Sequence, residues 1–232
     1  MAGEAGFAYE TKINKLLKGA GIQDKSFRGA RADKDAPDGE FEYQGTTYKV
    51  EIKLDLKVDF GQGSLDYDAK KKRWYLSGSS TEAGRAMREF LCEVGVPEMV
   101  NRSWGSKGPP RKGTVPLEKF KKEDVLADYK RFTEKKVDVA TDAIAKYYAT
   151  KKTYYIQIGG KGLYYMGQDP AKLGCPEFRP QTILRMRLKR GHSLPIYSYR
   201  FSTALRVPRL QDSTVNLENK DDLKAIAARA KS

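Results

Sequence analysis

Two short runs of alternating residues, separated by a Gln44-Gly45 pair, constrain the fold of this chain more than any other feature. The second run alternates an apolar set with a charged set, namely Tyr48, Val50, Ile52 and Leu54 against Lys49, Glu51, Lys53 and Asp55. Successive side chains point to opposite faces of a strand, so one face is apolar and the other is charged. The pattern predicts a hairpin with strands at about Glu40–Tyr43 and Thr47–Leu54.

Helical spacing and turn residues predict the remaining elements. A helix is expected at about Gly3–Ala20, and another at Thr81–Val94, which Ser80 or Thr81 caps and Gly95 and Pro97 end. The segment Glu98–Pro116 is rich in Gly, Pro, Ser and Lys and predicts an exposed loop. Further helices are expected at 117–132, 138–149 and 221–230, and further strands at 73–76, 153–158, 163–166, 182–189 and 196–202.

The composition predicts a folded protein without a membrane partner. Although only 39% of the 232 residues are hydrophobic, fourteen Tyr and nine Phe are too many for a disordered chain. No apolar run approaches the ~20 residues that span a bilayer, and the N-terminus lacks the pattern of a secretory signal. We therefore expect a soluble, cytoplasmic protein, and the sequence leaves its host and its oligomeric state open, with a homodimer among the options.

Histidine and cysteine chemistry has little support in this sequence. The two cysteines, Cys92 and Cys175, are far apart, and His192 is the single histidine. A structural zinc site needs about four such ligands. The two cysteines are therefore interpreted as reduced thiols, and nucleases that depend on several histidines are disfavoured.

The charge of the chain favours a polyanionic partner. The net charge is +14, from 44 Lys and Arg against 30 Asp and Glu, and nucleic acid is the commonest partner of such chains. No acid occurs in 178–210 or in 101–116, whereas acids are concentrated in 33–68. We predict phosphate contacts from five residues of the acid-free segments, which are Arg185, Arg187, Lys189, Arg111 and Lys112. The alternative for 182–189 is an ordinary half-exposed strand.

Asp38, Glu51 and Lys53 form the candidate catalytic cluster. Glu51 and Lys53 share one face of the second strand, and the hairpin brings Asp38 close to them. Two converging carboxylates suit Mg²⁺, which can orient a phosphate and lower the pKa of an attacking water. Lys53 would then act as an electrostatic stabiliser or as a general base with a lowered pKa. The alternative is a solvated hairpin whose charges face water.

This arrangement resembles the PD-(D/E)XK nuclease superfamily in its Pro37-Asp38 and Glu51-Ile52-Lys53 residues. The resemblance implies that Asp38 and Glu51 bind the metal and that Lys53 is the catalytic lysine. The Gly6-x-x-x-Glu10 spacing is similar to one found on the first helix of several branches, which adds Glu10 to the metal site. Gln62 matches a polar residue that often follows the lysine strand. The resemblance covers about residues 4–77, and it takes the helix near Thr81 as the next helix of the family's αβββαβ core.

The resulting expectation is an α/β, restriction-endonuclease-like protein with a mixed sheet core flanked by helices. We expect one domain over 1–232, with a catalytic core at about 4–95 plus 151–210, a helical insertion at about 96–150 and extra C-terminal strands. The expected function is hydrolysis of DNA phosphodiester bonds with Mg²⁺, for which Mn²⁺ substitutes, by an endonuclease acting on duplex or branched DNA. The alternatives are a non-catalytic basic DNA-binding protein and an RNA-directed nuclease with the same site.

Overall fold

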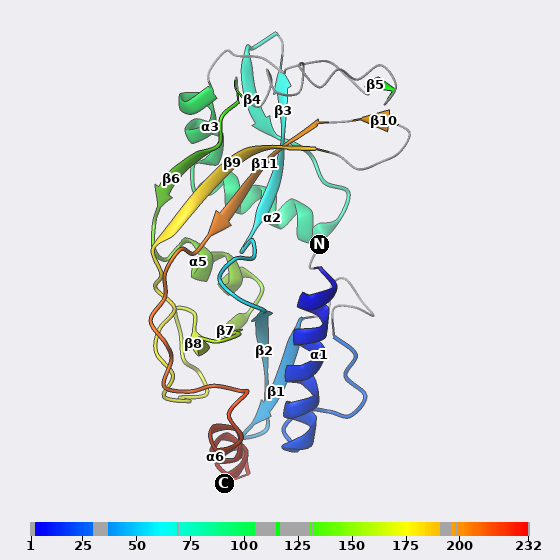
Figure 1. Ribbon diagram of the computed structural model, residues 1–232. Coiled ribbons are helices and arrows are strands. Elements are labelled where there is room, and N and C mark those ends of the chain that lie inside the picture. The colour runs from blue at the N-terminus through cyan, green and yellow to red at the C-terminus, as the bar shows by residue number, and fades with distance from the viewer. Residues whose placement is uncertain are drawn as a thin grey trace. The chain divides into compact units, whose positions relative to one another are not determined.

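The computed structural model describes residues 3–29, 37–68, 70–104, 115–116, 130, 132–190, 196–197 and 199–231. Its described part is a mixed α/β protein with five helices, and the chain divides into two compact units (Figure 1). Unit 1 comprises 1–58, 141–181 and 207–232, and unit 2 comprises 59–140 and 182–206. Within the described ranges, every helix is too short or too polar to cross a membrane.

Unit 1 is built on a mixed four-stranded sheet in the order β1-β2-β7-β8. The hairpin strands β1 (Gly39–Tyr43) and β2 (Thr46–Lys53) are antiparallel, while β2 and β7 (Thr153–Ile158) are parallel. The edge strand β8 (Gly162–Tyr165) returns antiparallel to β7. The unit's helices are α1 (Glu4–Gly19), α5 (Ala143–Thr150) and α6 (Lys220–Ala230).

The predicted hairpin is confirmed, and its two faces have different neighbours. Gln44 and Gly45 both adopt positive φ, at 47° and 74°, as a two-residue hairpin turn requires. Val50 and Ile52 are buried in one core cluster with α1, and Figure 1 shows α1 lying along the hairpin. The alternation of β2 therefore leaves Glu51 and Lys53 on the other face of the strand.

Unit 2 is built on a five-stranded antiparallel sheet in the order β4-β3-β11-β9-β6. Its strands are β3 (Gln62–Asp68), β4 (Arg73–Leu76), β6 (Lys135–Val139), β9 (Thr182–Arg190) and β11 (Tyr199–Arg206). Two short strands, β5 (Val115–Pro116) and β10 (Ile196–Tyr197), pair with each other. The helices α2 (Glu82–Glu93) and α3 (Val96–Trp104) also belong to this unit, whose core contains the packed rings of Trp74, Trp104 and Phe132.

The structure corrects the predicted loop at Glu98–Pro116, because α3 occupies 96–104. Proline is tolerated in the first turn of a helix, where its missing N–H has no partner to lose, so α3 accommodates Pro97 as its second residue. Val96, Val100 and Trp104 are spaced four residues apart and are buried on one side of the helix. The pattern was present in the sequence, but the glycines and prolines after 104 concealed it.

The predicted helix at 138–149 is also corrected. Residues 135–139 form β6, which pairs with β9, and α5 begins only at Ala143. The predicted helix at 117–132 lies largely outside the described residues.

The segment predicted as an insertion, 96–150, contributes to both units: 96–140 belongs to unit 2 and 141–150 to unit 1. The helix near Thr81, α2, belongs to unit 2 and contacts β3 there. In unit 1 the helix that precedes the parallel strand is α5 instead. The hairpin is thus followed in unit 1 by a helix and a strand parallel to β2.

Candidate active site

Asp38, Glu51 and Lys53 meet at the end of β2 in unit 1. The Lys53 Nζ lies 3.7 Å from Asp38 Oδ2 and makes a shorter hydrogen-bonded ion pair with Glu51 Oε1. The backbone N–H of Ile52 donates to Asp38 Oδ2 at 3.1 Å, which fixes the Asp38 carboxylate against the strand. All three side chains are partly buried, with 17%, 14% and 19% exposed for Asp38, Glu51 and Lys53. The three residues that the sequence grouped together therefore form one cluster.

Tyr148, which the sequence analysis did not identify, completes the cluster from α5. Its hydroxyl donates to Glu51 Oε1 at 2.7 Å, and its side chain is buried. Because a carboxylate accepts several hydrogen bonds, Tyr148 and Lys53 together orient Glu51. No local pattern could have identified Tyr148, which is 97 positions from Glu51 in the chain.

Burial and unequal charge shift the pKa values of this cluster in different directions. Burial, together with the neighbouring Glu51 carboxylate, raises the pKa of Asp38 to about 7 despite the nearby Lys53. Burial also disfavours the charged form of Glu51, but the Lys53 ammonium outweighs it and lowers the pKa of Glu51. Burial acts against the charge of Lys53, yet Glu51 and Asp38 raise its pKa above the ordinary value. Of the two roles considered for Lys53, this raised pKa favours the electrostatic stabiliser over the general base.

Glu10 lies on α1 beside the same cluster. The pKa of Glu10 is raised, mainly by burial. The positive charge of Lys53 acts against this shift and the negative charge of Glu51 adds to it, so the Glu10 carboxyl interacts with both groups. Among the described residues, the three carboxyl groups of Glu10, Asp38 and Glu51 all interact with the ammonium of Lys53, and Lys151 adds a further positive charge near Glu51. This excess of acid in a partly buried site favours an additional cation.

Asn14 and Gln23 hold the start of β1 against α1. The Asn14 side-chain amide donates to the backbone oxygens of Asp38 and Glu10, at 2.8 and 2.9 Å. Gln23 in turn donates to Asn14 Oδ1 and to the Glu40 carbonyl, both at 2.7 Å. These amides position the backbone that carries Asp38, and the sequence analysis did not identify them.

Gly39 allows this close approach of β1 to α1. A Cβ at position 39 would lie 2.9 Å from Ile52, 3.0 Å from Val50 and 3.1 Å from Asn14. These distances are shorter than ordinary van der Waals contacts, so a larger residue would force these three side chains to shift. The short distances from a Cβ at this position explain why glycine follows Asp38.

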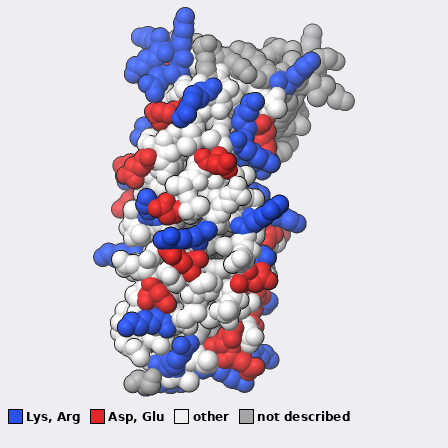
Figure 2. Space-filling view, turned by 90° about the vertical axis from the view of Figure 1, so that its left-hand side faces the viewer, with Lys and Arg blue, Asp and Glu red and all other residues white. Residues whose placement is uncertain are grey.

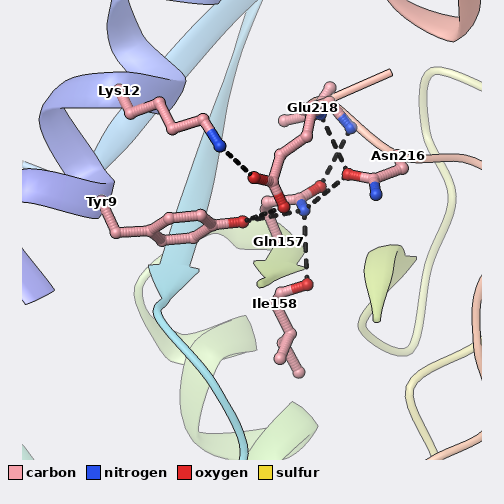
Figure 3. Close-up of polar contacts among 7 residues, drawn as sticks. Tyr9, Lys12, Gln157, Ile158, Asn216 and Glu218 are labelled. Atoms are coloured by element: carbon pink, nitrogen blue, oxygen red, sulfur yellow. Dashed lines mark hydrogen bonds and ion pairs between the residues drawn. The ribbon is translucent and has the colours of Figure 1, made fainter. Parts of the chain in front are cut away.

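A second polar network anchors α1 within unit 1 (Figure 3). The buried Gln157 of β7 donates to Tyr9 Oη at 3.2 Å and to Asn216 Oδ1 at 2.9 Å. Tyr9 and Lys12 both donate to the Glu218 carboxylate, at 2.9 and 2.5 Å. Because Tyr9 immediately precedes Glu10, this network fixes the part of α1 that carries Glu10.

The donor set of the cluster fits a magnesium ion. Among the described residues, no three His, Cys, Asp or Glu side chains lie close enough together to form a complete metal-ligand group. Mg²⁺ does not require one, because it is usually bound through one or two carboxylates while waters and phosphate oxygens complete its octahedron. Asp38 and Glu51 would hold the ion, and Glu10 is the nearby third carboxylate.

The other predicted site residues lie in unit 2 or outside the described residues. Gln62 begins β3 in unit 2, whereas the four acidic and basic residues of the cluster belong to unit 1. Lys189 lies in β9, and Arg111 and Lys112 fall outside the described residues.

Arg185 and Arg187 lie on the outer face of β9 as predicted, but acids accompany them. Arg185 forms an ion pair with Glu134 Oε2 at 2.7 Å, and Arg187 lies 3.9 Å from Asp59 Oδ2. Asp59 also accepts a 2.8 Å hydrogen bond from Arg206. On the face drawn in Figure 2, blue and red side chains are interspersed over the described residues. The absence of acid from 178–210 in the sequence therefore does not make these arginines a uniformly basic surface.

Comparison of the chain with protein-family models, with curated proteins and with solved structures gave no match.

Proposed function

We propose that this chain is a metal-dependent nuclease of the PD-(D/E)XK type that hydrolyses DNA phosphodiester bonds, as an endonuclease on duplex or branched DNA. The observation that carries the proposal is the cluster of the Asp38 and Glu51 carboxyl groups with the partly buried Lys53 ammonium, beside Glu10, in a chain of net charge +14. Perturbed titratable groups that converge at one place are typical of catalytic sites.

The order of elements in unit 1 supports the restriction-endonuclease-like fold. Helix α1 precedes the hairpin, Asp38 lies directly before β1, and Glu51 and Lys53 lie on β2. A helix and a strand parallel to β2 follow in the same unit. The first three elements agree with the start of the αβββαβ core, which favours the family, whereas the next strand of the chain, β3, belongs to unit 2.

The residues of the cluster have distinct roles in this proposal. Asp38 and Glu51 would hold Mg²⁺ with Glu10 nearby, and Mn²⁺ would substitute because both ions accept oxygen ligands. When bound, the ion lowers the pKa of a water and stabilises charge on the phosphate oxygens. Lys53, which stays charged, stabilises the same negative charge, and Tyr148 holds Glu51 in place. Asn14 and Gln23 keep the Asp38 backbone positioned for this geometry.

The test is incubation of the whole protein with supercoiled, linear, branched and single-stranded DNA and with RNA, in Mg²⁺ and in EDTA. We expect cleavage of DNA in Mg²⁺ or Mn²⁺ and none in EDTA, because the site offers carboxylates and no His or Cys ligand. Cleavage of RNA alone would identify an RNA-directed nuclease. Tight binding of DNA without cleavage in any metal would identify a non-catalytic binding protein, and full cleavage in EDTA would exclude the metal mechanism.

A further inference from the structure

A pocket of about 230 Å³ in unit 1 opens beside the candidate active site. One face of α1 and the segment 27–29 line it, and its wall includes Glu10 and Asp38 from the cluster. Since a water molecule in the liquid occupies about 30 Å³, the pocket accommodates a group much larger than a water or a single ion. We refer to it as the α1 pocket.

Two of the cations that line the α1 pocket have no acidic partner among the residues that the structure describes. Lys15 and Arg28 are both exposed, and neither forms an ion pair with any described residue. The third cation, Lys18, has a structural role, because its Nζ donates to the carbonyls of Lys25 and Phe27, at 3.1 and 2.7 Å. Lys18 thereby ties the segment that carries Arg28 to α1, and it leaves Lys15 and Arg28 for a ligand.

The charges of the α1 pocket change sign along its wall. The carboxylates of Glu10 and Asp38 belong to the cluster, where a bound cation would face a phosphate, while Lys15 and Arg28 supply positive charge elsewhere on the same wall. A polynucleotide strand presents a phosphate at every nucleotide, so a strand whose scissile phosphate lies at the cluster brings a neighbouring phosphate into the same region. Lys and Arg that contact phosphates supply most of the affinity of such complexes.

The remaining wall of the α1 pocket suits the sugar and base of a nucleotide. Phe7 and Phe27 are half-buried and line the pocket together with Thr11 and Asn14. Aromatic rings stack on bases, and they accept any base because each has a π-face. A free phosphate ion would use only the cationic part of this wall.

We propose that the α1 pocket binds the nucleotide adjacent to the scissile phosphate, with Lys15 and Arg28 on its backbone phosphate and Phe27 against its base or sugar. This assignment rests on the proposed nuclease function, which places the scissile phosphate at Asp38 and Glu51. It makes the strand, rather than a free anion, the ligand of this surface.

The test compares Lys15→Gln/Arg28→Gln with a matched control, Lys172→Gln/Lys220→Gln, which removes two exposed charges of unit 1 that do not line the pocket. Affinity for a short single-stranded oligonucleotide is measured in EDTA over a salt series. The pocket variant should flatten the slope of log affinity against log salt by ~0.7, since both cations contact one phosphate and each phosphate contact contributes about 0.7 for single strands. The control should change the slope much less, and equal slopes for both variants would overturn the proposal.

Two further measurements distinguish the ligand and separate this proposal from the proposed function. Phe27→Ala should weaken oligonucleotide binding by roughly 10-fold, within the range measured for lost base stacking, without changing the salt slope. Displacement of the oligonucleotide by inorganic phosphate at a similar concentration would show that the surface binds free anions, and it would also overturn the proposal.

The outcomes for the pocket and for the nuclease function are distinguishable. If the wild-type protein never cleaves DNA but shows the predicted slopes, the nuclease function alone is contradicted. If the wild-type protein cleaves DNA but the pocket variant binds the oligonucleotide like the control, the role proposed for the α1 pocket alone is contradicted.

Discussion

The α1 side of unit 1 and the β9 strand of unit 2 both carry charged residues, but they balance those charges differently. In unit 1 three carboxyl groups interact with the Lys53 ammonium, and Lys15 and Arg28 have no acidic partner among the described residues. In unit 2 Arg185 lies against Glu134, and Arg187 and Arg206 lie against Asp59. A paired charge stabilises the fold, whereas an unbalanced one remains available for a metal or a phosphate. The comparison therefore favours unit 1 for the proposed chemistry and binding, and it favours a structural role for the β9 arginines.

The largest expected effect comes from the cluster itself. Asp38→Asn and Lys53→Met should each reduce single-turnover DNA cleavage on the order of 10³-fold or more, because each removes a charge that acts on the metal or on the phosphate. DNA affinity should be largely retained, since most of the cations proposed to contact the backbone lie outside the cluster. Cleavage at the wild-type rate by a folded Lys53→Met protein would show that the site is elsewhere. Circular dichroism and a thermal melt provide the folding control.

A smaller effect is expected from Tyr148, which orients Glu51 without contacting substrate. Tyr148→Phe removes only the hydroxyl that donates to Glu51 Oε1 at 2.7 Å. Loss of such a supporting hydrogen bond typically costs 10- to 100-fold in metal affinity or activity. We expect a raised Mg²⁺ concentration for half-maximal cleavage, with partial recovery at high Mg²⁺. Tyr147→Phe, on the neighbouring ring, is the matched control, and an equal effect of both variants would argue against a specific role of Tyr148.

The smallest effect is expected from the paired arginines of unit 2. Arg185→Gln and Glu134→Gln should each lower the free energy of unfolding by about 0.2–1 kcal/mol, as is usual for partly exposed ion pairs. A double-mutant cycle measured by chemical denaturation should show that the two losses are not additive. The salt dependence of DNA binding should change less for Arg185→Gln than for Lys15→Gln/Arg28→Gln. The reverse order would restore β9 as the DNA-binding surface, as the acid-free sequence alone predicts.

The sequence predicted the local features of unit 1 because they depend on neighbours in the chain. The alternation from Tyr48 to Leu54 and the Gln44-Gly45 turn determine the hairpin, and the hairpin brings Asp38 to Lys53. The helical spacing of α1 places Glu10 in the same region. Each of these inferences uses a repeat of two residues, for a strand, or of 3.6 residues, for a helix. Such repeats can be recognised within one short segment of the sequence.

What the sequence could not predict depends on contacts between distant segments. Tyr148 reaches Glu51 across 97 positions, and Glu134 reaches Arg185 because β6 pairs with β9. A segment without acids is therefore no guide to the charges on adjacent strands. The division into two units could not be predicted either, because strands from 59–140 and from 182–206 pair in one sheet only after folding.

The central claim is that Glu51 and its neighbours cleave DNA through a bound divalent metal. The most direct test measures single-turnover cleavage at saturating enzyme over a Mg²⁺ titration, for the wild type and for Glu51→Gln. The substitution keeps the size of the side chain and removes its charge, and DNA binding confirms that both proteins are folded. We predict that wild-type cleavage rises with Mg²⁺ to a plateau and disappears in EDTA, while Glu51→Gln stays inactive throughout. Cleavage by Glu51→Gln at the wild-type rate, or wild-type cleavage that persists in EDTA, would contradict the claim.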